Sequence, residues 1–257
     1  MIAVKNLNPD YSKLYNEGSY GDIYRCKEVN DILVKVIKKC DSGGSGNGEF
    51  NKKIIKQLNH KNIMKIFGVQ KSPLSNDIYF IYIQYINGIT LNEYLMKYKK
   101  LPSADIMTII KQIFAGLHFI HQRKITHRDI KLENIIVDGN LNTTIVDFGL
   151  AYYGLPCKNI VGTSGFFAPE MIYSPNSYGS KCDIWSTGCV LYFMVCRYMP
   201  LYFSEIKECY IEQINSRVEI KYYEDVWKDY GGLKDLCKKM LVYDCESRLG
   251  SGDFLYN

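Results

Sequence analysis

The sequence predicts an α+β fold in which a small, strand-rich lobe precedes a larger helical lobe. Short runs rich in Ile, Val and Tyr dominate the first part of the chain, whereas apolar residues recur at helical spacing from residue 91 onward. The length of 257 residues, 47% of them hydrophobic, is enough for one domain built as a two-lobed unit. We expect the lobes at about 1–83 and 89–257, with a crossing segment at 84–88.

The first lobe is expected to contain strands and one short helix. Two strands surround Gly18 and Gly21, and a third covers Ile32–Ile37. Residues 42–48, rich in Gly and Ser, have the composition of a flexible linker. A short helix at 49–58 and strands at 63–69 and 78–86 follow.

The second lobe is expected to be mainly helical. A stretch of short strands and turns at 125–150 interrupts the helical pattern. The predicted helices are 91–99, 103–123, 182–196, 204–215 and 231–242.

Charge and cysteine content narrow the class of partner and compartment. The chain has 32 Lys and Arg against 27 Asp and Glu, and this mild excess of +5 favours a solvated surface over a nucleic-acid site. Nine scattered cysteines without a Cys-x-x-Cys pair indicate reduced thiols. No signal peptide is visible, and the apolar stretch 188–196 is too short to span a bilayer. We therefore expect an intracellular protein (cytoplasmic or nuclear), monomeric, with no membrane or nucleic-acid partner.

The segment 127–149 contains the groups that phosphoryl transfer requires. This chemistry needs a way to hold the phosphates, a metal that neutralises their charge, and a base that orients the acceptor hydroxyl. The run His-Arg-Asp-Ile-Lys-Leu-Glu-Asn at 127–134 supplies a carboxylate at Asp129 and an amide oxygen at Asn134. Asp147, in Asp-Phe-Gly, supplies a second carboxylate, and such hard oxygen ligands suit magnesium.

These motifs resemble those of the eukaryotic-type protein kinase family. Ala-Pro-Glu at 168–170, Asp-Ile-Trp-Ser-Thr-Gly at 183–188 and a late Arg248 follow in the family's order. The resemblance covers about Tyr11 to Leu249 and implies the two-lobed kinase fold. Lys131 and the run 162–170 look like the serine/threonine class.

The resemblance implies a role for each matching residue. Asp129 would be the catalytic base, Lys131 would neutralise the transferring phosphate, and Thr163 would contact Asp129. Asn134 and Asp147 would bind Mg²⁺. ATP and protein substrates are the implied reactants.

The residues that would bind ATP resemble the family pattern less closely. Lys35 matches the lysine that reaches the α- and β-phosphates, and the segment 16–23 resembles the glycine-rich loop, with Asn16 in place of its first glycine. Leu33 replaces an alanine that packs on adenine, and the added bulk would cost about 1–3 kcal/mol in a formed pocket. The residues expected at the nucleotide are Leu14, Asn16, Gly18, Ser19, Tyr20, Gly21, Ile23, Leu33, Lys35, Ile83, Gln84, Ile86 and Ile136.

The glutamate that usually pairs with this lysine is not at its expected position. Counting back from His60 reaches Asn51, and the nearest acid is Glu49. At 100° of rotation per residue around the axis of the predicted helix, the side chain of Asn51 lies about 40° from that of Ile55, and the side chain of Glu49 lies about 120° from it. An unbroken helix would direct Asn51 toward Lys35, whereas a frayed first turn would let Glu49 swing in.

Three functions compete on these observations. We predict an active serine/threonine kinase, because the base and metal groups are intact. The alternative is a weakened kinase or pseudokinase that acts as a nucleotide-binding or partner-binding scaffold. A small-molecule phosphotransferase is disfavoured by the complete segment 162–170. Because residues 150–162 contain no Ser or Thr, we expect activity without phosphorylation of the activation loop.

Overall fold

The computed structural model describes residues 7–17, 21–38, 54, 57–73, 75, 77–201 and 207–255. The chain divides into two compact units, Met1–Asn87 and Gly88–Asn257. This boundary falls inside the expected crossing segment at 84–88. Within the described ranges, no helix is both long and apolar enough to cross a membrane.

The first unit is built on a five-stranded antiparallel sheet with the strand order β1-β2-β3-β5-β4. One hydrophobic cluster packs on one face of this sheet. In it, Val34 and Tyr82 are fully buried together with Ile32 and Phe80. Because side chains alternate along a strand, Leu33 and Lys35 lie on the opposite face. The strands are β1 (Pro9–Asn16), β2 (Asp22–Cys26), β3 (Ile32–Lys38), β4 (Ile66–Lys71) and β5 (Ile78–Gln84).

The turn before β2 requires glycine at position 21. Gly21 has a φ of +121°, a value that L side chains rarely adopt. A Cβ atom there would lie 2.4 Å from the carbonyl oxygen of Val36. Most of the helix predicted at 49–58, and the linker predicted at 42–48, lie outside the described residues.

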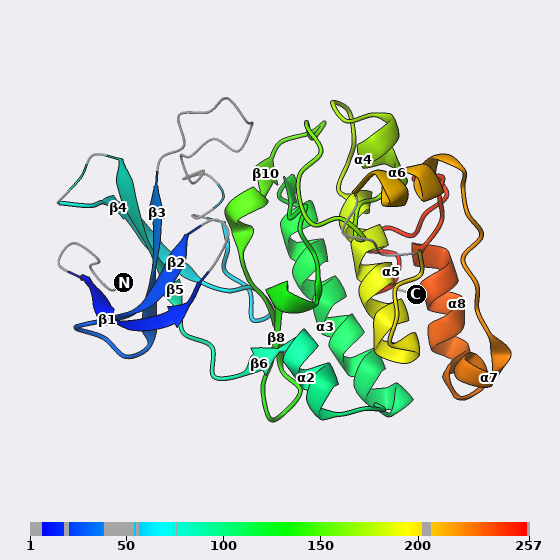
Figure 1. The fold of residues 1–257 in the computed structure, drawn as a ribbon, viewed down its shortest axis with the longest axis horizontal. Helices are drawn as coiled ribbons and strands as arrows, with labels where there is room; N and C mark the ends of the chain where they lie inside the picture. Colours follow the sequence, from blue (N-terminus) through cyan, green and yellow to red (C-terminus); the bar gives the residue numbers. More distant parts are fainter. Residues whose placement is uncertain are drawn as a thin grey trace. The chain divides into compact units, whose positions relative to one another are not determined.

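The second unit is a helical assembly arranged around α5. This helix packs against α3 and α8 and lies between them in Figure 1. Thirteen of its residues are buried, which fits a helix that is surrounded by protein on all sides. The main helices are α2 (Leu91–Lys97), α3 (Ser103–His121), α5 (Lys181–Cys196), α6 (Lys207–Asn215) and α8 (Gly231–Met240).

Short elements connect these helices and frame the site. The strands are β6 (Ile89–Thr90), β7 (Ile125–Thr126), β8 (Ile135–Val137), β9 (Thr143–Ile145) and β10 (Tyr152–Tyr153). Short helices are η2 (Leu132–Asn134), η3 (Phe148–Leu150), α4 (Pro169–Tyr173), α7 (Glu224–Trp227) and η4 (Lys228–Tyr230). The α+β class, with strands first and helices after, is confirmed.

Several boundaries differ from the predictions, and at one of them a distant residue makes contact with the end of the helix. The helix expected to reach residue 99 ends at Lys97, where the Arg197 guanidinium donates to the carbonyl oxygens of Leu95 and Tyr98. Its start is locally encoded, because Thr90 and Glu93 form a capping box. The strand expected to begin at residue 63 begins at Ile66.

Candidate active site

A buried carboxylate anchors the loop that follows β7. Asp183 of α5 is 0% exposed, and its two oxygens accept the backbone N–H groups of His127 (2.9 Å) and Arg128 (2.8 Å). His121 Nε2 lies 2.9 Å from the Asp183 carboxylate. Burial alone would raise the pKa of Asp183, but the hydrogen bond with His121 and the nearby positive charge outweigh it, so the pKa lies below 3.8. Asp183 is therefore an ionised anchor for the loop 127–134.

Three side chains hold the Asp129 carboxylate. Thr163 Oγ1 donates to one oxygen at 2.8 Å, and Asn134 Nδ2 donates to the other at 2.9 Å. Lys131 Nζ lies 3.3 Å from the second oxygen and also donates to Thr163 Oγ1 at 2.8 Å. The predicted residues Asp129, Lys131, Asn134 and Thr163 thus form one cluster, in which Asp129 is only 7% exposed.

The amide of Asn134 is oriented so that its oxygen is available to a metal. Its nitrogen donates both to the Asp129 backbone carbonyl at 2.8 Å and to the Asp129 side chain. Asp147 is the N-cap residue of η3 and has a left-handed conformation (φ +56°), and one of its carboxylate oxygens accepts from Gly149 N at 3.1 Å. A carboxylate and an amide oxygen are hard donors, so the residues present fit Mg²⁺ that is also bound by substrate phosphates and water.

Aromatic packing holds the Asp-Phe-Gly turn against the loop 127–134. Phe148 is buried, and its ring meets the His127 ring edge-on with centroids 4.8 Å apart. His127 Nε2 lies 2.9 Å from the carbonyl oxygen of Val146, the residue before Asp147. The loop that contains Asp129 and the turn that contains Asp147 are thereby joined.

A buried ion pair holds the end of the segment that runs from Asp147 to Glu170, which we call the activation segment. Arg248 binds Glu170 through two parallel contacts of 2.6 and 2.8 Å, and the arginine side chain is 0% exposed. The guanidinium also donates to the Val242 and Lys181 carbonyl oxygens and lies over the Trp185 ring. The late Arg248 noted in the sequence is thus the partner of the glutamate in Ala-Pro-Glu.

In the first unit, strand register gathers the expected nucleotide residues on one face of the sheet. Lys35 lies opposite Ile23 on one side and Ile81 on the other, and Leu33 lies opposite Ile83. Directly opposed residues of antiparallel strands point to the same face. Ile23, Leu33, Lys35 and Ile83 therefore share the face opposite to Val34 and Tyr82. On this second face Leu33 and Ile83 are also buried, and Lys35 is 8% exposed.

The remaining predicted residues are less closely grouped. Leu14 is 47% exposed on β1, and Gln84 is exposed at the end of β5, where its backbone N–H donates to Lys65. Ile136 belongs to β8 in the second unit, where it pairs with Thr90 and Thr144. Asn16 and Ile86 are described at the end of β1 and after β5. Gly18, Ser19, Tyr20, Glu49 and Asn51 lie outside the described residues.

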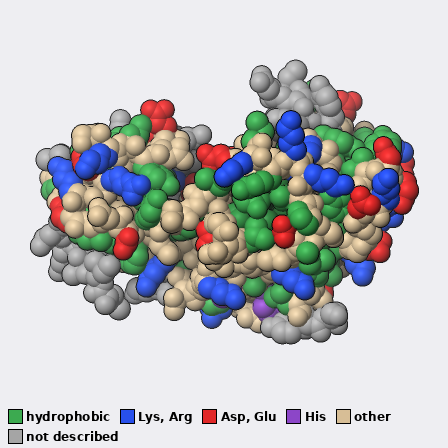
Figure 2. Space-filling model, turned by 90° about the horizontal axis from the view of Figure 1, so that it is seen from below, with side chains coloured by type: hydrophobic (Ala, Val, Ile, Leu, Met, Phe, Trp, Pro, Cys, Tyr) green, Lys and Arg blue, Asp and Glu red, His purple; other side chains and the backbone are tan. Residues whose placement is uncertain are grey.

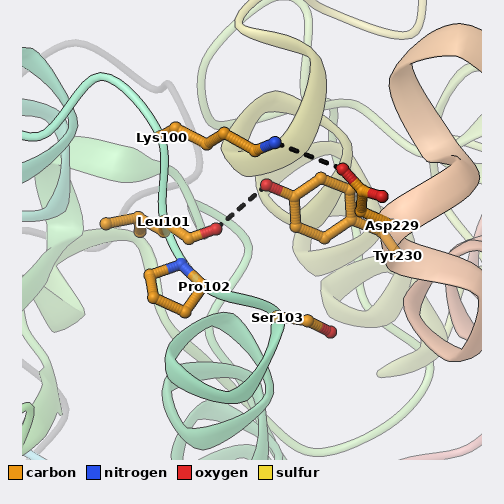
Figure 3. A pocket seen from close by; sticks show the side chains of 6 residues that line it. All are labelled: Lys100, Leu101, Pro102, Ser103, Asp229 and Tyr230. Atoms are coloured by element: carbon orange, nitrogen blue, oxygen red, sulfur yellow. Dashed lines mark hydrogen bonds and ion pairs between the residues drawn. The ribbon is translucent and has the colours of Figure 1, made fainter.

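A cavity of about 350 Å³ lies elsewhere in the second unit, at the start of α3. Figure 3 shows Lys100 reaching Asp229 (3.2 Å) and the Tyr230 hydroxyl donating to the Leu101 carbonyl (3.0 Å) across this cavity. The charged side chains of this cavity thus bind each other, and none of its lining residues belongs to the Asp129 cluster.

Two residues of the site were not identified from the sequence. His121 supports Asp183, and Tyr178 contacts the activation segment. Neither lies in a motif, and each acts on residues at least 19 positions away along the chain. Their roles depend on tertiary contacts, so no local pattern could have revealed them.

Comparison with known proteins identifies the family. The protein kinase domain family matches residues 12–256. The chain is 32% identical to calcium-dependent protein kinase 5 of Plasmodium berghei over 75% of its own length and 36% of that protein. It is 30% identical to calcium-dependent protein kinase 4 of Plasmodium falciparum (95% and 47%) and 28% identical to serine/threonine-protein kinase cds1 of Schizosaccharomyces pombe (99% and 59%).

The chain therefore belongs to the protein kinase family. It spans between 36% and 59% of the length of these three relatives.

Proposed function

We propose that this chain is a serine/threonine protein kinase domain that transfers the γ-phosphoryl group of ATP to protein hydroxyls. The observation that carries the proposal is the Asp129 carboxylate, held by Thr163, Asn134 and Lys131. A scaffold protein has no need for a carboxylate oriented from three directions. The relatives named as serine/threonine or calcium-dependent protein kinases support the same class.

Asp129 acts as the base in the proposed reaction. Its carboxylate orients the acceptor hydroxyl and takes the proton as the oxygen–phosphorus bond forms. The bond from the γ-phosphorus to the β–γ bridging oxygen breaks, and ADP leaves with the electron pair. Thr163 and Asn134 prevent the carboxylate from rotating, so its geometry is set before the substrate arrives.

Two lysines and the metal ligands handle the phosphate charge. Lys131 lies 3.3 Å from Asp129 and donates to Thr163, which leaves its ammonium beside the acceptor position. Lys35, on the face shared with Ile23 and Leu33, binds the α- and β-phosphates. Asn134 and Asp147 would hold Mg²⁺, which when bound neutralises charge on the phosphates.

Surface charge and cysteines support a protein partner in a reducing compartment. On the face that Figure 2 shows, the basic and acidic side chains of the described residues are interspersed. Eight described cysteines are free thiols, six of them buried. We propose an intracellular protein that acts on other proteins. The monomeric state stays a prediction.

The test is phosphate transfer from γ-labelled Mg·ATP to a generic protein substrate, followed by identification of the labelled amino acids. We expect labelled Ser and Thr, and a loss of about 10²- to 10⁴-fold in kcat for Asp129→Asn. Asp235→Asn, on the exposed side of α8, is the matched control and should retain activity. Equal transfer by the wild type and Asp129→Asn would refute the proposal. Thermal stabilisation by Mg·ATP without any transfer would instead identify a nucleotide-binding scaffold.

A further inference from the structure

Arg128, next to the proposed base, has a buried guanidinium that binds carbonyl oxygens. The residue is 5% exposed, and its Nε donates to the Leu150 carbonyl at 2.7 Å. Its Nη1 donates to the Lys158 carbonyl at 2.8 Å, and the guanidinium lies 5.0 Å from the centre of the Tyr152 ring. Among the residues that the structure describes, no carboxylate forms an ion pair with this guanidinium.

Tyr178 binds the same stretch of the activation segment from the other side. It is 3% exposed, and its hydroxyl donates to the Asn159 carbonyl at 2.7 Å. The same hydroxyl lies 3.4 Å from Arg128 Nη1, within reach of a weak hydrogen bond in which it is the acceptor. Burial raises the pKa of the Tyr178 phenol well above its ordinary value, although Arg128 opposes the shift, so the group stays a neutral donor.

The backbone of Tyr178 is bound to the segment as well. Cys157 N donates to the Tyr178 carbonyl at 2.8 Å, and Tyr178 N donates back at 3.4 Å, which makes an isolated antiparallel bridge. Asn159 has a left-handed backbone (φ +64°), a conformation that asparagine tolerates well. The carbonyls of Lys158 and Asn159 thus both point into the cluster formed by Arg128 and Tyr178.

The segment returns to the catalytic loop directly after this cluster. Gly162 approaches the Arg128 carbonyl so closely that a Cβ atom would lie 2.4 Å from that oxygen. Thr163 then donates to Asp129. Only three residues, 160–162, therefore separate the carbonyl held by Tyr178 from the hydroxyl that orients Asp129, and a shift at Asn159 would be transmitted to Thr163.

We propose that Tyr178 is a positioning residue for the kinase reaction: together with Arg128 it holds the Lys158 and Asn159 carbonyls, and so keeps Thr163 against Asp129 without a phosphate on the segment. This inference rests on the proposed function. In this cluster, backbone carbonyl oxygens and the Tyr178 hydroxyl accept the hydrogen bonds of the Arg128 guanidinium. They take the place of an anionic group such as a phosphate.

The variant that tests it is Tyr178→Phe, which keeps the ring and its packing and removes only the hydroxyl. The Asn159 carbonyl loses the hydrogen bond from Tyr178, so we expect kcat for a protein substrate to fall about tenfold. The KM for ATP should stay unchanged, because the first unit is untouched. Tyr243→Phe is the matched control, because it also removes a phenol-to-carbonyl hydrogen bond (2.9 Å, to Val218) from the second unit.

Amide hydrogen exchange separates positioning from general stability. In Tyr178→Phe we expect faster exchange confined to about residues 155–165, whereas Tyr243→Phe should leave that range unchanged. Wild-type enzyme treated with phosphatase should retain its activity. Unchanged kcat or unchanged local exchange in Tyr178→Phe would overturn the inference, and so would wild-type activity that depends on phosphate at Tyr152 or Tyr153. If the wild type transfers no phosphate, the proposed function fails, while the exchange data still decide whether Tyr178 holds the segment.

Discussion

The two units hold their functional groups in different ways. In the second unit, Asp129 is fixed by side chains from two segments, and its loop is fixed in turn by Asp183 of α5. In the first unit, strand register places Lys35 between Ile23 on β2 and Ile81 on β5. It likewise places Leu33 between Arg25 and Ile83. Substitutions in the second unit should therefore act by disturbing the orientation of Asp129 and its loop. Substitutions in the first should act locally, through size and charge.

The largest effect is expected where the second unit buries a charge pair. Glu170→Gln leaves Arg248 buried beside a neutral partner, and we expect the free energy of unfolding to fall by about 3–5 kcal/mol. Chemical denaturation measures this loss. The matched control is Lys100→Met at the Lys100–Asp229 pair, whose side chains are 72% and 57% exposed. That change should cost at most about 1 kcal/mol, and an equal loss at both pairs would contradict the importance of burial.

The next effect concerns the hydroxyl that holds the proposed base. Thr163→Val removes the donor to Asp129 and the acceptor for Lys131, and we expect kcat to fall by roughly 10- to 150-fold, which corresponds to about 1.5–3 kcal/mol. Thr163→Ser keeps the hydroxyl and should recover most of the activity. Steady-state kinetics decides the matter. Unchanged kcat in Thr163→Val would contradict a role for this hydrogen bond, and a serine variant as poor as valine would mean that the hydroxyl alone does not hold Asp129 in place.

A third prediction concerns acid stability. The pKa of Asp183 is lowered in the fold, so its ionised form adds stability that is complete above 3.8 and is lost as the pH falls through the lower folded value. Asp183→Asn has one acceptor oxygen for three donors, and we expect a loss of about 1–3 kcal/mol at pH 7. The difference from the wild type should shrink below about pH 4. Urea unfolding across pH tests this, and a difference that grows in acid would contradict the assignment.

The smallest effect is expected on the nucleotide face of the first unit. Leu33→Ala removes bulk beside Lys35, and we expect the KM for ATP to fall roughly fivefold. Val34→Ala, on the opposite face of the same strand, is the matched control: both variants lose core packing, but Val34→Ala should leave the KM unchanged. An unchanged KM in Leu33→Ala would place Leu33 away from the adenine.

The sequence could predict features that depend on neighbouring residues, but not those that depend on contacts between distant parts of the chain. Asp129, Asn134 and Asp147 occur within one motif-rich stretch, so their grouping could be anticipated, and α3 was recognisable from its apolar stripe. The end of α2 could not be anticipated, because Arg197, about a hundred residues later, determines it. Tyr178 could not be predicted either, because its hydroxyl donates to a backbone carbonyl. Every residue has such a group, so no residue type in the sequence points to this contact.

The hydrogen bond between His121 and Ser251 has a consequence for how the chain is made. Ser251 Oγ lies 3.0 Å from His121 Nδ1, while the other ring nitrogen of His121 supports Asp183. The two residues are 130 positions apart, so at about 5–20 residues per second a ribosome needs roughly 7–26 s between them. Throughout that interval the nascent catalytic loop lacks part of its final support. The contact with Asp183 can therefore gain its support from Ser251 only after residue 251 has been synthesised.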